Sequence, residues 1–172
     1  MCTRLTPKLI KVCHDIKAKD DAFEVIFITV NNCDDDTFEE LLFSLLWLAL
    51  PVDNPRKERL MYRLKVKHFS GIIIAIGPSG RTVARNTREL IQNYGANAYP
   101  FTEEHLQHLE GQMNEMAKGW PKKLKHELHP EHEIVLRQES IYDCNACSET
   151  RIGWRFCCEL CAFCLHPRCF EL

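Results

Sequence analysis

The sequence contains no long apolar run, no excess of one charge and no internal repeat or low-complexity tract. Its most apolar segment, Leu41 to Val52, is interrupted by Ser44 and Pro51 and stays below the roughly 18 residues of a membrane span, so we expect no transmembrane segment. The formal net charge of -2 gives no basic field, and we expect no nucleic-acid partner. The first seven residues lack the apolar core of a signal peptide, which favours an intracellular protein of the cytosol or nucleus.

What the sequence does contain is a cluster of cysteines near its C-terminal end. Seven of the ten cysteines lie between Cys144 and Cys169. Three pairs in this stretch have two residues between their members, a spacing that suits zinc at about 2.3 Å per Zn–S bond. In a protein that is not secreted, such cysteines are better explained as metal ligands than as disulfides. The three pairs are Cys144 with Cys147, Cys158 with Cys161, and His166 with Cys169.

The rest of the chain predicts alternating helices and strands. The β-branched apolar runs Phe23–Val30 and Ile72–Ile76 are typical of buried strands, and Arg81–Val83 can return as a hairpin partner. We expect Trp47–Pro51 to be a rigid connector. This order predicts an α/β layer fold. Apolar spacing and capping residues predict helices over residues 4–18, 37–46, 56–64, 86–93 and 103–116.

A basic hinge after Trp120-Pro121 suggests a boundary between Lys118 and His129. We therefore predict three parts, comprising an α/β domain over 1–100, a helical connector over 101–128 and a zinc-binding module over 129–172. The module offers few apolar residues for a core. Those expected to form it are Ile134, Leu136, Ile141, Trp154, Phe156, Phe163 and Leu165.

Several segments, in this order, resemble the plant nucleoredoxins. They are 23–28, 37–40, 47–51, 76–83, 98–104, 117–121 and the tail 163–169. The resemblance implies a thioredoxin-like fold and a C-terminal zinc module related to the divergent diacylglycerol-type modules of plants. It also implies a thiol–disulfide oxidoreductase acting as a protein-disulfide reductase, with protein thiols or disulfides, a full-length nucleoredoxin or a thioredoxin reductase as partners. The sequence has no dinucleotide-binding fingerprint, so NAD(P)H would act only indirectly, through a reductase.

Two departures from the family pattern count against ordinary dithiol exchange. Cys2 matches the second cysteine of the family's Trp-Cys-Pro-Pro-Cys turn, so the first cysteine and the strand before it would precede Met1. The segment Lys67–Gly71 lacks the proline that the family places in the cis form before the next strand. We interpret the chain as an N-terminally truncated nucleoredoxin with impaired activity, in which Cys2 is a residual catalytic thiol. The alternative is a non-catalytic, zinc-stabilised interaction module or a partner of a full-length nucleoredoxin.

The resemblance also implies two interleaved zinc sites. The first comprises Cys144, Cys147, His166 and Cys169, and the second Cys158, Cys161, His132 and a fourth ligand. We predict His129 as the fourth ligand, with His126 as the runner-up. Cys157 and Cys164 are surplus; spare thiols are the simpler interpretation, with ligand substitution or redox sensing as the alternatives.

Overall fold

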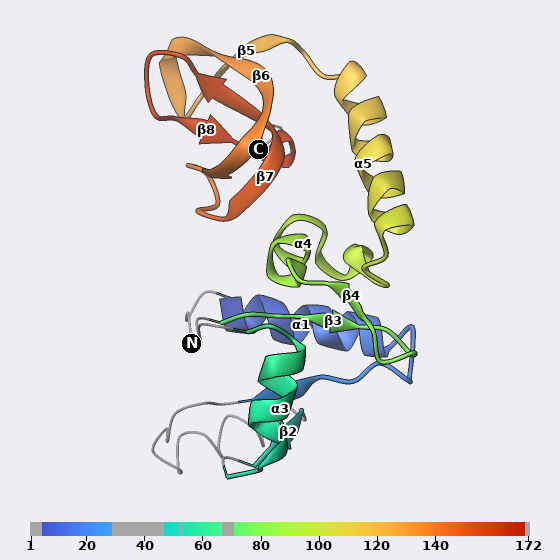
Figure 1. Cartoon of the computed structure of the whole chain (residues 1–172). Coiled ribbons are helices and arrows are strands. Elements are labelled where there is room, and N and C mark those ends of the chain that lie inside the picture. Colours follow the sequence, from blue (N-terminus) through green and yellow to red (C-terminus); the bar gives the residue numbers. More distant parts are fainter. Residues whose placement is uncertain (1–4, 29–46, 52, 67–70, 171–172) are drawn as a thin grey trace.

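The computed structural model describes residues 5–28, 47–51, 53–66 and 71–170. An α/β part lies at one end of the molecule and a sheet rich in cysteine and histidine at the other, with helix α5 (Glu103–Lys118) leading from the first to the second (Figure 1). None of the helices in these ranges is both long and apolar enough to cross a membrane.

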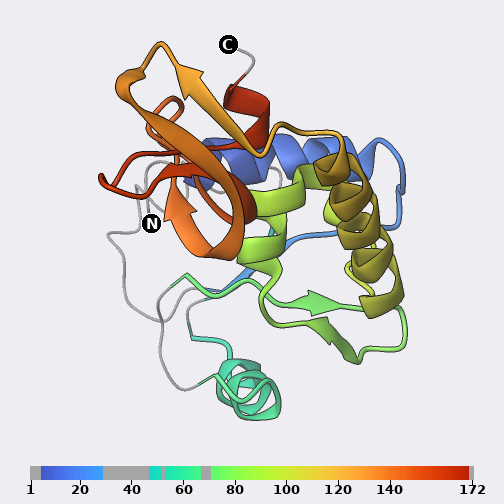
Figure 2. The same cartoon turned by 90° about the horizontal axis from the view of Figure 1, so that it is seen from above.

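The centre of the α/β part is formed by helices α1 (Leu5–Lys17) and α4 (Thr87–Tyr94), close to the predicted bounds. Val12 and Ile16 lie one turn apart on α1 and pack with Leu90 and Ile91 of α4. Helix α4 ends at Gly95, whose φ of +59° a residue with a side chain rarely adopts. Figure 2 shows the two helices stacked beneath the C-terminal sheet.

The strands of the α/β part are shorter than predicted. Strand β1 (Ile26–Ile28) covers only part of the range 23–30, and β3 covers only Ala75–Ile76. Strand β3 pairs antiparallel with β4 (Thr82–Ala84), as the hairpin prediction requires. Helix α3 (Arg56–Arg63) is present, whereas the predicted helix 37–46 lies outside the described residues.

The predicted rigid connector Trp47–Pro51 is wrong, because its centre is a strand. Strand β2 (Leu48–Leu50) pairs in parallel with β1, in a register that places Ile26 opposite Leu48. The Leu-Ala-Leu run can pair in this way because Pro51, which lacks the backbone N–H that a ladder needs, follows the strand.

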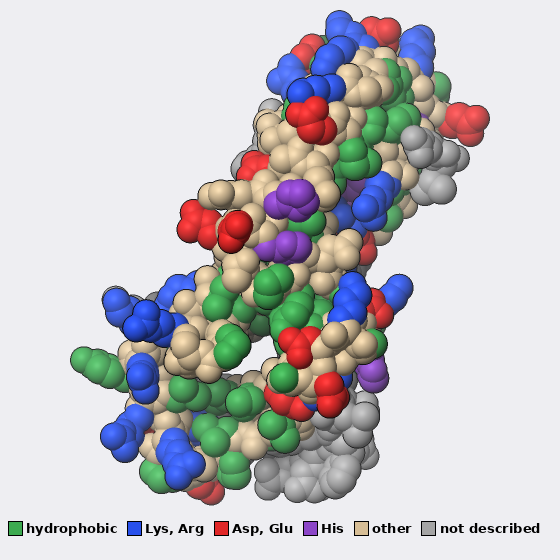
Figure 3. All heavy atoms as spheres, turned by 90° about the vertical axis from the view of Figure 1, so that its right-hand side faces the viewer, with side chains coloured by type: hydrophobic (Ala, Val, Ile, Leu, Met, Phe, Trp, Pro, Cys, Tyr) green, Lys and Arg blue, Asp and Glu red, His purple; other side chains and the backbone are tan. Residues whose placement is uncertain are grey.

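The two small sheets leave apolar side chains in solvent. Ile26, Leu48 and Ile76 are each more than half exposed. In the space-filling view, hydrophobic side chains gather around a hollow in the lower half of the molecule (Figure 3). The short strands do not change the fold class. A thioredoxin-like fold mixes helices and strands, and the described residues of this part contain both.

The C-terminal sheet has four antiparallel strands in the order β5-β6-β7-β8. Strand β5 (Lys123–His126) lies inside the range that was predicted as a helical connector, so the sheet begins before His129. The domain boundary itself stays a prediction. The other strands are β6 (His129–Asp143), β7 (Thr150–Cys158) and β8 (Cys164–Leu165).

The core of this sheet is small. Ile134, Phe156 and Leu165 are fully buried, and Leu136 packs with them, whereas Trp154 and Phe163 are only partly buried. The prediction that Ile141 belongs to this core is wrong. Ile141 is 64% exposed and pairs with the exposed Ile152 near the end of the β6–β7 ladder, beyond a register shift in β6.

Polar contacts join the sheet to the α/β part. The Arg151 guanidinium donates to the backbone oxygen of Asn93 at 2.8 Å, and the Asn93 side-chain oxygen accepts from the Ile152 backbone N–H at 3.0 Å. Lys8 on α1 forms an ion pair with Glu149 at 3.1 Å. The first two contacts join strand β7 to the C-terminal end of α4, and the third joins the β6–β7 turn to α1.

Candidate metal centre

The first cluster brings together the four residues Cys144, Cys147, His166 and Cys169. Their potential ligand atoms all lie within 4.8 Å of one another. The Cys147 Sγ and Cys169 Sγ atoms lie 3.3 and 3.8 Å from the His166 Nδ1 atom. A tetrahedral zinc site with ordinary bond lengths has an S–N edge of about 3.6 Å, so this spacing fits one ion.

Backbone hydrogen bonds hold the first knuckle. The Ser148 N–H donates to the Cys144 carbonyl at 2.8 Å, which closes the turn between β6 and β7. The His166 N–H donates to the Cys144 Sγ at 3.4 Å and so ties the knuckle to the second half of the cluster. Burial alone would raise the pKa of the Cys144 thiol, but N–H groups from Cys147, His166 and Ala146 bring it below the ordinary value.

Two members of this cluster, Cys169 and His166, are held without charge. Burial raises the pKa of Cys169 to about 12, with the neighbouring Cys144 and Cys147 sulfurs adding to the effect. Burial, with Arg151 nearby, lowers the pKa of His166 to about 4, so its imidazole is neutral at neutral pH. Neutral imidazole is the form that binds a metal, and a cation among the sulfurs would allow the thiols to ionise together. The donor set therefore fits zinc.

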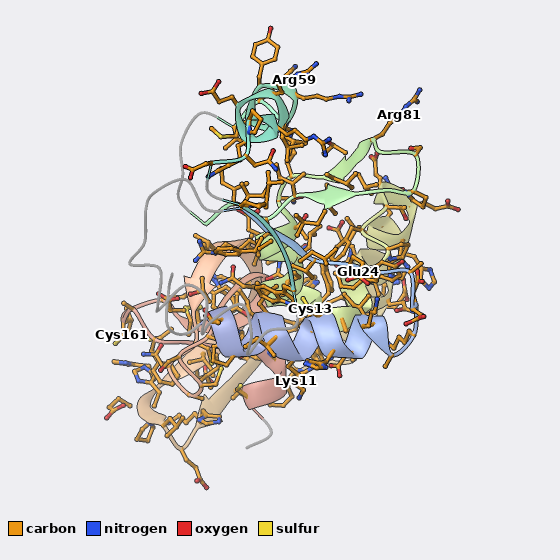
Figure 4. All side chains as sticks on the ribbon, turned by 90° about the horizontal axis from the view of Figure 1, so that it is seen from below. Lys11, Cys13, Glu24, Arg59, Arg81 and Cys161 are labelled. Carbon is orange, nitrogen blue, oxygen red and sulfur yellow. A yellow bond between two sulfur atoms is a disulfide. The ribbon has the colours of Figure 1, made fainter. Side chains whose placement is uncertain are left out.

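The second cluster contains His129 and His132 from β6 and Cys158 and Cys161 from the β7–β8 hairpin. The Cys161 Sγ lies 3.6 Å from the His132 Nδ1, again close to a tetrahedral edge. The Leu160 N–H donates to the Cys158 Sγ at 3.4 Å within the knuckle. Figure 4 shows Cys161 at the edge of the molecule, and its side chain is exposed.

His129 carries a structural sign of a missing partner, as does His166, whose Nε2 atom is likewise buried without a hydrogen-bond partner among the described residues. The Nε2 atom of His129 is buried and has no hydrogen-bond partner among the described residues, whereas the Nδ1 atom of His129 lies 3.5 Å from a Glu131 carboxylate oxygen. A carboxylate on one ring nitrogen and a metal on the other is a recurrent arrangement for ligating histidines. The ring also stacks on Phe163, with the centroids 4.6 Å apart, which fixes its orientation.

The runner-up ligand, His126, is not part of this cluster. Its Nδ1 accepts the Leu128 backbone N–H at 3.1 Å, so it closes the β5–β6 turn instead. The structure thus groups the same eight residues that the sequence predicts, in the same two sets, while the presence of a metal stays a prediction. Glu131 was missed, although a carboxylate two residues after a candidate ligand could have indicated it.

Cys157 and Cys164, the surplus cysteines, are joined by a disulfide. They stand opposite each other in the β7–β8 register. The interpretation as spare thiols is therefore wrong for this structure. The sequence offered no signal for the pair, because the register of a two-residue strand is set by the fold around it.

The predicted catalytic residue Cys2 lies outside the described residues. Among the described cysteines, Cys13 is the one outside the C-terminal sheet. It faces the interior from α1 (Figure 4), and burial raises the pKa of its thiol to about 11. A buried, protonated thiol is a poor nucleophile, so Cys13 serves packing rather than exchange.

Comparison with known proteins gives consistent matches. Residues 1–83 match a family described as thioredoxin-like. The chain is 44% identical over 168 residues to probable nucleoredoxin 1 of Arabidopsis thaliana, an alignment that covers 98% of the chain and 29% of that protein. It is 31% identical over 172 residues to probable nucleoredoxin 2 of Oryza sativa subsp. japonica, covering 98% of the chain and 43% of the relative. Nucleoredoxin of Bos taurus is 26% identical over 58% of the chain.

The chain is thus similar to plant nucleoredoxins over nearly its whole length and has a thioredoxin-like N-terminal part, and the resemblance inferred from its residues is confirmed. The chain spans less than half the length of the plant relatives that it matches over most of its length.

Proposed function

We propose that this chain contributes a two-zinc structural module to a nucleoredoxin-type protein that works in thiol–disulfide chemistry. The observation that carries the proposal is the convergence of five cysteines and three histidines into two tetrahedral-sized clusters. The first cluster joins the β6–β7 turn to the segment after β8, and the second joins β6 to the β7–β8 hairpin. Each cluster offers four protein ligands, the closed arrangement of structural zinc.

The zinc ions would supply a cross-link among strands that the small core cannot hold alone. Cys144, Cys147, His166 and Cys169 would hold one ion, and Cys158, Cys161, His132 and His129 the other. In the second set, the buried Nε2 of His129 is the atom available to the metal, because Glu131 occupies the other ring nitrogen.

Protein-disulfide reduction is the activity that the relatives favour, with protein thiols and disulfides as substrates and reducing equivalents from NAD(P)H through a separate reductase. The setting would be the cytosol or nucleus. We propose that residues 1–172 alone have impaired activity, because Cys2 has no second cysteine at active-site spacing and Cys13 is buried. The alternative function is a non-catalytic interaction module that works with a full-length nucleoredoxin.

Two measurements test these proposals. Atomic emission on the purified chain should give two zinc ions, and His132→Ala should give one. The matched control is His126→Ala, which removes a histidine of the same sheet from outside the cluster and should retain both ions. One zinc in His126→Ala, or two in His132→Ala, would mean that the ligand set is wrong.

Activity is tested by insulin reduction with dithiothreitol as the electron donor. We expect the wild-type chain to match Cys2→Ser, both near the uncatalysed rate. Clear turnover by the wild type that is lost in Cys2→Ser would show that Cys2 is catalytic and that the impaired interpretation is wrong.

A further inference from the structure

We propose that Cys157 and Cys164 form a reversible redox site, separate from any thioredoxin-type dithiol, whose opening loosens the hairpin that carries Cys158 and Cys161. The pair would exchange electrons with a dithiol or a small disulfide. The two cysteines belong to neither metal cluster, so their sulfurs are free for this chemistry.

The sheet brings the two cysteines together without help from the disulfide. Their Cα atoms lie 4.2 Å apart, close to the roughly 4.5 Å of a non-hydrogen-bonded antiparallel pair. Cys157 also stands opposite Val135 of β6, on the far side from β8. The Asn145 side-chain oxygen accepts the Cys164 N–H, and the Cys164 carbonyl accepts the Asn145 N–H, both at 2.8 Å.

These contacts hold each cysteine from outside the β7–β8 pair. When the S–S bond breaks, β6 still holds Cys157 and Asn145 still holds Cys164, so the two thiols stay adjacent. Re-oxidation is then an intramolecular step with a high effective concentration. This arrangement favours a bond that opens and closes over one that is lost once reduced.

The disulfide lies on the face of the sheet opposite the core. Side chains alternate between the faces of a strand, so Phe156 and Cys158 point one way and Cys157 the other. The buried cluster around Phe156 accordingly includes Cys158 but not Cys157. Reduction therefore need not disturb the core of the sheet.

A dithiol supplies the two electrons and two protons that reduce the disulfide to two thiols. A thiolate of the dithiol attacks the sulfur of Cys164, which is the less buried of the two, and the S–S bond breaks. The bonding electrons leave with the Cys157 sulfur, which takes up a proton. The second thiol of the dithiol then displaces Cys164, which leaves the protein with two thiols and the donor as a disulfide.

The pair is placed to act on the second zinc cluster. The bond closes the hairpin between residues 157 and 164, and both cysteine ligands of that cluster lie within it. Across the hairpin, the Cys158 N–H donates to the Phe163 carbonyl at 2.9 Å, and after reduction this bond would close the hairpin without a covalent link between its two arms. This part of the inference rests on the proposed zinc sites, whereas the redox pair does not.

The redox pair is tested on the full wild-type chain. The protein is equilibrated in mixtures of reduced and oxidised dithiothreitol, its free thiols are alkylated, and digestion with mass spectrometry maps them. We expect Cys157 and Cys164 to gain label together, as one two-electron couple. Label on either residue alone, a pair that is free in every mixture, or a bond that stays closed in every mixture would overturn the proposal.

The coupling is tested by the rate at which a chromophoric chelator removes zinc. Loss of the closed hairpin should speed release of one of the two ions by up to roughly tenfold, both in the reduced wild type and in Cys164→Ser, with the zinc content at rest unchanged. Cys13→Ser is the control, since it removes a thiol remote from the sheet. Equal rates in the oxidised and reduced wild type would overturn the coupling. One zinc at rest in Cys164→Ser would instead assign Cys164 as a ligand and overturn the proposed ligand set.

Discussion

The two ends of this molecule achieve order by different means. In the α/β part, strands of two or three residues form two separate pairs, and the buried residues come mainly from helices and the turn after α4. In the C-terminal sheet, β6 runs for 15 residues and four strands join in one ladder, yet the apolar core consists of a few side chains beside cysteines. The first end depends on apolar packing between helices, whereas we propose that the second depends on cross-links.

A sheet of about 45 residues buries too little apolar surface to be stable alone. Two ions and one disulfide would supply what the core lacks, since structural zinc contributes on the order of 10 kcal/mol to such modules. The comparison therefore predicts that the two ends respond differently to the same kind of damage.

The largest expected effect is the loss of a zinc ligand. Cys147→Ser should reduce the zinc content from two ions to one and open the C-terminal sheet to protease, because the remaining core cannot hold the strands. The part before Lys118 should resist protease as in the wild type. Ala146→Ser, one residue away in the same exposed turn, is the control and should retain both ions. Two ions in Cys147→Ser would contradict the assignment.

The next largest expected effect distinguishes a buried side chain of the sheet from an exposed one. Phe156 is fully buried and packs edge-on against Phe170, with the ring centroids 4.8 Å apart. Phe156→Ala should lower the free energy of unfolding by about 3–5 kcal/mol, measured by urea denaturation with zinc present. Ile141→Ala is the control, and its exposed side chain predicts a change within about 0.5 kcal/mol. A similar loss of unfolding free energy in both variants would mean that Ile141 belongs to the core after all.

A smaller effect concerns the contact between the two ends. Asn93→Ala removes the side-chain oxygen that accepts the Ile152 N–H, which should cost about 1 kcal/mol. Hydrogen exchange at the Ile152 amide should accelerate, while exchange in α1 stays unchanged. Asn97→Ala, at an exposed position of the turn after α4, is the control and should leave that amide protected. Unchanged exchange in Asn93→Ala would indicate that the two ends do not depend on this bond.

The smallest effect is electrostatic and confined to the α/β part. The Tyr99 hydroxyl donates to Asp20, and this hydrogen bond, together with the Ala22 N–H, lowers the pKa of the Asp20 carboxyl. A depressed carboxyl pKa stabilises the fold above the unfolded pKa and loses that contribution as the pH falls through the folded one. In Tyr99→Phe, the pKa of Asp20 should rise toward its ordinary value, as measured by NMR titration of its carboxyl carbon. Tyr94→Phe should leave it unchanged, and an unchanged pKa in Tyr99→Phe would exclude the hydrogen bond as its cause.

Periodicity and capping were sufficient for the long helices, because those signals are local. The bounds of α1 and α4 agree with the prediction to within a residue or so, and α5 extends two residues beyond it. The strands of the α/β part were less predictable. Leu48–Leu50 has no alternation of its own and becomes a strand because β1 lies beside it.

Six of the candidate ligands were readable from the residues because each of the three pairs brings two ligands together across two residues, whatever surrounds it. The histidines of the second set and the division into two sets came from the family resemblance. The choice of His129 over His126 was different, since it depends on which face of β6 meets the β7–β8 hairpin, and the spacing alone left both open. The Cys157–Cys164 disulfide could not be predicted from the sequence. A separation of seven residues does not indicate a bond, and the two cysteines become neighbours only because β8 pairs with β7. Local spacing thus determined the metal-ligand pairs. Only the tertiary structure decided between His129 and His126 and showed that Cys157 and Cys164 form a disulfide, because both outcomes depend on the register between strands distant in the chain.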